Sequence, residues 1–86
     1  MSFTVLLSPK AAKDLNKLER QVLSKIDKAL LGLAKNPHPH GVKVLQDKNL
    51  PQYRIRIGDY RILYDVYVKD RAVYILKIGH RKDIYR

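Results

Sequence analysis

Apolar residues in the first 35 positions recur at helical spacing, after a short strand-like run. Residues 3–7, FTVLL, are β-branched and apolar and predict a strand. Ser8 and Pro9 follow, a pair that suits the cap and the first turn of a helix. Two apolar series then predict a helical hairpin that ends near Lys35. The first series is Ala11, Ala12, Leu15 and Leu18, and the second is Val22, Ile26, Leu30 and Leu33.

The second half of the chain changes to alternation with period two, which is typical of strands. A loop at 36–41 combines two prolines with a glycine and should end the second helix. Residues 42–45 predict a short edge strand, and the longer strands are predicted at 52–57, 60–68 and 72–80. We therefore expect one α+β domain over residues 1–86, in which an N-terminal strand and a two-helix hairpin precede an antiparallel β-meander (β-α-α-β-β-β).

The dipeptide Gly-Asp at 58–59 predicts the register of two strands, because a two-residue loop joins them. Ile57 then pairs with Tyr60, and Arg56 pairs with Arg61. The face that should receive the helices collects Tyr53, Ile55, Ile57, Ile62, Tyr64, Val66 and Val68. If the last strand keeps its apolar alternation, that face also receives Tyr74, Leu76 and Ile78.

The opposite face is predicted to be cationic. It carries Arg54, Arg56, Arg61 and Lys77, and Arg81 continues the same alternation just beyond the last strand. Directly opposed like charges destabilise a sheet by a few tenths to about 1 kcal/mol. A bound phosphate reverses that sign, because guanidinium groups donate in a planar, bidentate geometry to phosphoryl oxygens. The alternative is a solvated face on which arginine stems cover apolar surface.

Charge and composition narrow the class of partner. Eighteen Lys and Arg against eight Asp and Glu give a formal charge of +10, which favours nucleic acid over a merely soluble surface. The chain has no cysteine, and its three histidines lack metal-ligand spacing, so we expect no metal and no cofactor. No apolar run approaches the roughly 20 residues that span a bilayer. We expect a soluble, unprocessed, cytoplasmic protein without a membrane partner.

Three segments carry a resemblance to a known family: YRIRI at 53–57, DYRILY at 59–64 and IGHRKDIY at 78–85. Together with LSPKAAKDLNKL and GVKVL, they resemble the RelE/ParE toxin superfamily of type II toxin–antitoxin systems, RelE-like branch, over nearly the whole chain. The resemblance implies the RelE-like microbial ribonuclease fold. It also implies a metal-independent, ribosome-dependent mRNA endonuclease (an mRNA interferase) that inhibits translation. Two alternatives stay open: a ParE-like, non-enzymatic inhibitor of DNA gyrase, and a degenerate toxin or plain RNA-binding module.

The same resemblance implies the site residues. Arg61 matches a core arginine, Arg81 and Tyr85 match the arginine and tyrosine of the catalytic tail, and Arg54 and Arg56 occupy positions that are basic in RelE-type toxins. The implied reaction is attack of a ribose 2′ hydroxyl on its adjacent phosphate, which leaves a 2′,3′-cyclic phosphate and a 5′ hydroxyl. Arginine stays protonated at any working pH, so these side chains suit stabilisation of phosphorane charge.

The proton acceptor is not settled by the resemblance, because arginines stand here where family members carry lysine. His80 is the expected substitute, since a histidine imidazole can accept and release a proton near neutral pH. Alternatively, His80 ends its strand by packing against Tyr60. The catalytic set is therefore Arg56, Arg61, His80, Arg81 and Tyr85, and the expected phosphate contacts are Arg54, Lys77, Lys82 and Arg86.

The resemblance implies three macromolecular partners. The first is a cognate antitoxin whose amphipathic, partly acidic segment folds on the toxin and covers apolar and cationic surface. The other two are messenger RNA in the ribosomal A site and ribosomal RNA, which scattered helix lysines would contact weakly. Larger DNA-binding complexes would form through the antitoxin.

Overall fold

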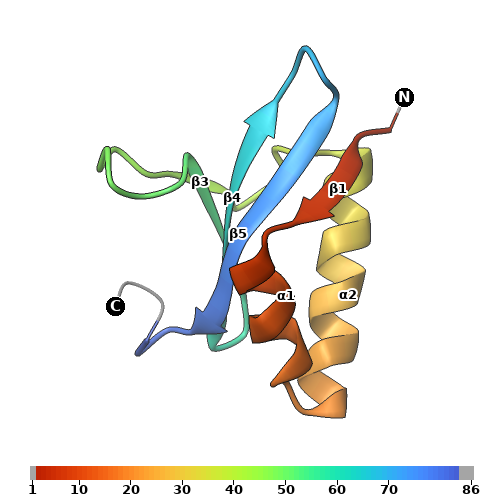
Figure 1. Ribbon diagram of the computed structural model, residues 1–86, viewed down its shortest axis with the longest axis vertical. Coiled ribbons are helices and arrows are strands. Elements are labelled where there is room, and N and C mark those ends of the chain that lie inside the picture. Colours follow the sequence, from red (N-terminus) through yellow and green to blue (C-terminus); the bar gives the residue numbers. More distant parts are fainter. Residues whose placement is uncertain (1, 84–86) are drawn as a thin grey trace.

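Two helices lie together on one side of a five-stranded sheet (Figure 1). The computed structural model describes residues 2–83. The elements, in chain order, are β1 (Thr4–Leu7), α1 (Pro9–Asn16), α2 (Arg20–Lys35), β2 (Lys43–Val44), β3 (Tyr53–Ile57), β4 (Tyr60–Tyr67) and β5 (Ala72–His80). The predicted α+β architecture is confirmed.

The sheet has the strand order β1-β5-β4-β3-β2. Strands β2 to β5 pair antiparallel, and β1 pairs parallel with β5 at one edge. The predicted helix start is also confirmed, because the Ser8 hydroxyl accepts a hydrogen bond from the Ala11 N–H at 3.0 Å and Pro9 stands in the first turn. The strand that pairs parallel with β5 is thus β1, which directly precedes this helix.

The hydrophobic core lies between the helices and one face of the sheet. The predicted register of β3 and β4 is confirmed, with Ile57 opposite Tyr60 and Arg56 opposite Arg61. The buried core cluster combines residues of both helices with residues of β4 and β5: Ala11, Ile26, Leu30, Leu33, Ile62, Tyr64, Val66, Val73, Ile75 and Ile78. Aliphatic and aromatic residues of β3 and β4 thus face the helices, as their alternation predicts.

The predicted alternation of β5 is wrong in its first half. Leu63 pairs with Lys77 while Tyr64 pairs with Ile75, so β5 holds one extra residue at a β-bulge. Val73 and Ile75 therefore enter the core in place of Tyr74 and Leu76, which are only half-buried. Val68 was also predicted on the core face, but β4 ends at Tyr67 and Val68 is 67% exposed. A bulge reverses the facing of every residue beyond it, and counting alternation does not detect it.

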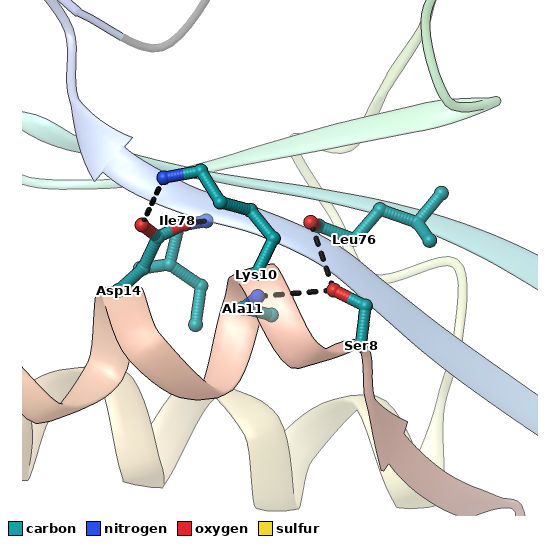
Figure 2. A network of polar contacts seen from close by, with 6 residues as sticks. All are labelled: Ser8, Lys10, Ala11, Asp14, Leu76 and Ile78. Atoms are coloured by element: carbon teal, nitrogen blue, oxygen red, sulfur yellow. Dashed lines mark hydrogen bonds and ion pairs between the residues drawn. The ribbon is translucent and has the colours of Figure 1, made fainter.

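Strand β5 extends beyond β1, and side chains of Ser8 and of α1 form hydrogen bonds with its outer edge there (Figure 2). The Ser8 hydroxyl donates to the Leu76 carbonyl at 3.0 Å. The Ile78 N–H donates to Asp14 Oδ2 at 3.0 Å, and Lys10 Nζ pairs with Asp14 Oδ1 at 2.6 Å. Asp14 is only 8% exposed, so its carboxylate is a buried acceptor for the strand edge.

Replacing Asp14 with alanine should destabilise the fold, because the buried Ile78 N–H would lose its acceptor. We expect a loss of about 1–3 kcal/mol in the free energy of unfolding, measured by urea denaturation. Asp14→Asn keeps an acceptor oxygen and should lose less. Lys10→Ala removes only the half-exposed ion pair and should cost about 0–1 kcal/mol. An Asp14→Ala variant as stable as Lys10→Ala would contradict this edge contact.

Tyr64 is a buried aromatic residue whose hydroxyl makes a hydrogen bond. Its ring is 0% exposed, and its hydroxyl donates to the Pro37 carbonyl at 2.9 Å. This bond ties β4 to the loop that follows α2. Burial, and to a smaller extent the charge on Tyr53, raises the pKa of Tyr64 far above its ordinary value.

Alkaline pH should therefore weaken the fold through Tyr64. The unfolded tyrosine ionises near about pH 10, whereas the folded one resists ionisation, so its contribution is complete below about pH 10 and is lost as pH rises further. Tyr64→Phe should lose about 1 kcal/mol at neutral pH and show a shallower decline from about pH 10 to 12. Urea denaturation at a series of pH values measures both effects, and parallel declines in the two proteins would refute them.

Candidate functional site

The sheet face that points away from the helices collects cations from neighbouring strands. Arg56 and Arg61 are directly paired across β3 and β4, and the next row places Arg54 opposite Leu63 and Leu63 opposite Lys77. Directly paired residues of a sheet point to the same side. We call Arg54, Arg56, Arg61 and Lys77 the arginine face.

Lys43 of β2 also belongs to this face, because it pairs with Arg54. The sequence did not reveal it, since the register of a two-residue strand leaves no readable alternation. The GVKVL segment predicts a short strand here, but it does not predict which strand it pairs with. Lys43 is exposed and adds a positive charge beside Arg54.

Arg61 is the most deeply placed cation of the arginine face, at 8% exposure, whereas Arg56 is exposed. Arg61 Nη1 donates to the carbonyls of Tyr60 at 3.2 Å and Gly58 at 3.4 Å. A buried guanidinium requires such acceptors, because charge taken out of water without hydrogen bonds is strongly destabilising. The turn between β3 and β4 therefore holds one end of Arg61.

Arg81 follows the last residue of β5, and its backbone is tied to the same turn. Its N–H donates to the Asp59 carbonyl at 2.8 Å, which continues the pairing of β4 and β5 by one position. Arg81 and Lys82 are exposed. The predicted site residues Tyr85 and Arg86 lie outside the described residues. The structure thus brings the Arg81 backbone next to the turn that holds the Arg61 guanidinium.

His80 is placed differently from the arginines. It pairs with Tyr60, whose ring packs against the core, so His80 lies on the helix side of the sheet. The two rings meet edge to face, with centroids 5.5 Å apart at an interplanar angle of 81°. His80 Nδ1 accepts a hydrogen bond from the Lys82 N–H at 3.2 Å. The packing against Tyr60 that the alternation allowed is present.

His80 also lines a polar cleft of about 330 Å³ between α1 and the end of β5. Lys10, Lys17 and Lys77 contribute positive charges to the same cleft, and Asp14 and Asp83 contribute carboxylates. Within residues 2–83, no group of three or more His, Cys, Asp or Glu side chains could hold a metal ion. None of the described helices is long and apolar enough to cross a membrane.

Comparisons with known proteins agree on one family. The family model of the ParE toxin of the type II toxin-antitoxin system parDE matches residues 5–85. The chain is 34% identical to Toxin RelG of Mycobacterium tuberculosis over 87 residues, which covers 100% of this chain and 99% of that protein. It belongs to the RelE/ParE toxin superfamily. A second relative of the toxin, the putative toxin RelE1 of Methanocaldococcus jannaschii, is 34% identical over 89 residues and is covered to 98%.

Solved structures place this toxin in the RelE-like branch of the superfamily. The chain is similar to the RelBE2 toxin-antitoxin complex of Mycobacterium tuberculosis, with a TM-score of 0.83, 28% identity and coverage of 94% of this chain and 100% of the other. It is also similar to the archaeal RelE-RelB complex of Pyrococcus horikoshii, with a TM-score of 0.82, 29% identity and coverage of 96% and 99%. The fold of the RelE-type toxins therefore extends over almost the whole chain.

The paired arginines of this toxin should make its unliganded fold less stable. Arg56→Gln removes the like charge directly opposite Arg61 and should raise the free energy of unfolding by a few tenths to about 1 kcal/mol. Thermal denaturation should show a rise of up to about 5 °C at low salt, and the gain should shrink as salt screens the repulsion. Lys28→Gln, an equal charge change on the exposed side of α2, is the control. Equal effects in both variants would contradict a local cross-strand repulsion.

Proposed function

We propose that this toxin is a metal-independent endoribonuclease that cleaves messenger RNA on the ribosome and thereby inhibits translation. The observation that carries the proposal is the direct pairing of Arg56 with Arg61, together with the hydrogen bond that holds Arg81 to the turn before Arg61. Directly opposed arginines destabilise the free sheet, and an anion between or above them reverses that sign. The likeness to RelG and RelE1, both named as toxins, supports the same reading.

In the proposed reaction, the ribose 2′ oxygen attacks the adjacent phosphorus and the bond from phosphorus to the 5′ oxygen breaks. The 2′ hydroxyl gives up its proton to a base, and the leaving 5′ oxygen takes a proton from an acid, so the products are a 2′,3′-cyclic phosphate and a 5′ hydroxyl. Arg61 and Arg81 stabilise the negative charge that develops on the phosphorane. Arg56 adds to that charge stabilisation, and Arg54, Lys77, Lys82 and Arg86 hold flanking phosphates.

Proton transfer is proposed for His80 and Tyr85. Because His80 Nδ1 accepts from the Lys82 N–H, the neutral ring carries its proton on Nε2 in this arrangement. A neutral imidazole N–H is too weak an acid to protonate the leaving oxygen, so the proposed role of His80 is that of the base, which acts through Nδ1 when the Lys82 contact opens. Tyr85 serves to stack on a base, orient the hydroxyl or transfer a proton.

A cognate antitoxin is the proposed protein partner, since both solved relatives described above are toxin–antitoxin complexes. The surface that suits an amphipathic segment is an apolar groove of about 460 Å³ beside the outer strand β1. It is lined by Val5, Leu30, Leu31 and Ala34, with Asp27 as its charged member. Leu31 is 68% exposed there, so covering it removes apolar area from water. Acidic residues of the same segment would meet the cationic surface.

Inhibition of DNA gyrase is the second candidate function, and the match to the ParE family model favours it. In that case the toxin is not an enzyme, and the arginine face and tail are contact surfaces. Expression would then cause DNA damage while messages stay whole. The two functions are separated by mapping RNA 5′ ends and scoring DNA damage in the same cells.

Arg61→Ala and Arg81→Ala should each abolish message cleavage, because each removes a cation from the developing phosphorane. We expect the cleavage rate to fall at least about 100-fold, as for the loss of one transition-state donor. Primer extension on a message translated in a purified system measures the rate. Circular dichroism and antitoxin binding should remain unchanged for Arg81→Ala, whose side chain is exposed.

Lys69→Ala, which removes one exposed positive charge from the turn between β4 and β5, is the matched control and should cleave normally. Wild-type cleavage in both arginine variants would refute the site. Whole messages in the wild type, together with damaged DNA, would instead establish the gyrase alternative.

A further inference from the structure

The turn between β3 and β4 contacts both arginines that the proposed reaction places on the phosphorane. Three consecutive carbonyls take part. Those of Gly58 and Tyr60 accept from Arg61 Nη1, at 3.4 and 3.2 Å, and that of Asp59 accepts from the Arg81 N–H at 2.8 Å. Arg61 is the second residue after the turn in sequence, but Arg81 directly follows the far end of β5. The turn is therefore a shared point of attachment for residues 20 positions apart.

We propose that Gly58 and Asp59 form a positioning element that sets the place of Arg61 relative to Arg81. The inference rests on the proposed ribonuclease function and goes beyond it, because neither turn residue takes part in the chemistry. Two cations stabilise one pentacovalent phosphate only when both lie at hydrogen-bonding distance from its oxygens at once. A turn that holds one arginine by its guanidinium and the other by its backbone couples the two positions.

The conformation of the turn depends on Gly58. Its φ is +60°, whereas Asp59 has no positive φ, a combination that matches the type II′ turns favoured by glycine at the first loop position. A side chain with a Cβ strains such a backbone by about 1–2 kcal/mol. Among residues 2–83, and apart from Gly58 and its two chain neighbours, no heavy atom lies within 4 Å of the place where a Cβ on Gly58 would stand, so alanine there would cause no collision with them. Alanine at position 58 thus tests the backbone conformation alone.

Gly41 offers a matched control. It has φ +88° and equally open space around the position that a Cβ would occupy, but it lies in the loop between α2 and β2. Gly58→Ala and Gly41→Ala should therefore carry similar backbone strain. Gly58→Asn is the conservative variant, because asparagine tolerates positive φ better than other side chains do. Together, these three variants distinguish an effect of the 58–59 turn conformation from an effect of general destabilisation.

The experiment measures single-turnover cleavage at saturating ribosomes and, separately, affinity for the ribosome–message complex. We expect Gly58→Ala to lower the cleavage rate about 10- to 100-fold, since a displacement of about 1 Å can have this effect. Its affinity should stay within about two-fold of wild type. Gly58→Asn should recover most of the rate, and Gly41→Ala should cleave like wild type. Equal rates in Gly58→Ala and Gly41→Ala, or a loss of affinity alone, would overturn the inference.

A second readout does not depend on cleavage. Hydrogen exchange followed by NMR should show that the Arg81 amide is protected in wild type and in Gly41→Ala, and that it exchanges several-fold faster in Gly58→Ala. If wild type fails to cleave RNA while this pattern holds, the proposed function is wrong and the coupling of Arg81 to the turn stands. Unchanged Arg81 exchange in Gly58→Ala would refute the coupling itself.

Discussion

The register of the β3–β4 hairpin is the constraint on which the rest of the structure depends. A two-residue turn pairs Ile57 with Tyr60, and every later pair of the two strands follows from that one. Because alternate residues point to opposite sides, the same register puts Ile55 and Ile62 toward the helices and Arg56 and Arg61 away from them. A slip by one residue would bury the arginines and expose the core. Packing of the helix-facing side therefore holds the arginine face in place.

The second constraint is the open edge of β5. Strand β1 covers β5 only from Ala72 to Ile75, yet β5 must continue to His80 to bring Arg81 to the turn. Ser8 and Asp14 cover the remaining edge with side-chain hydrogen bonds, and Ser8 also caps the helix that carries Asp14. Ser8, the helix α1, the edge of β5 and the position of the Arg81 backbone thus form one connected set of interactions.

Positive charges concentrated on one side of a sheet repel one another and lower its stability. The helix-facing side compensates with a cluster that includes Tyr64, Ile62 and Ile75, all at 0% exposure. Any anionic partner that binds the folded chain and not the unfolded one adds stability by mass action. The proposed RNA substrate and the proposed acidic antitoxin segment would both have this property, so both proposals use the same cationic surface.

Several features of this protein follow from its sequence by itself. The two helices, the Ser8 cap, the 58–59 turn, the β3–β4 register and the shared facing of Arg54, Arg56 and Arg61 are all readable, because each depends on residues close together in the chain. The family is readable for a similar reason, since its segments around these arginines are contiguous.

Only the tertiary structure decided the rest, because it depends on contacts between distant residues. The parallel pairing of β1 with β5, the bulge that puts Ile75 in the core in place of Leu76, and the bond from Asp14 to Ile78 have no local signature. The same holds for the attachment of the Arg81 backbone to Asp59. Alternation predicts only whether neighbouring residues of a strand point to the same or to opposite sides of the sheet. The packing of the whole chain determines which strand or side chain pairs with each strand edge.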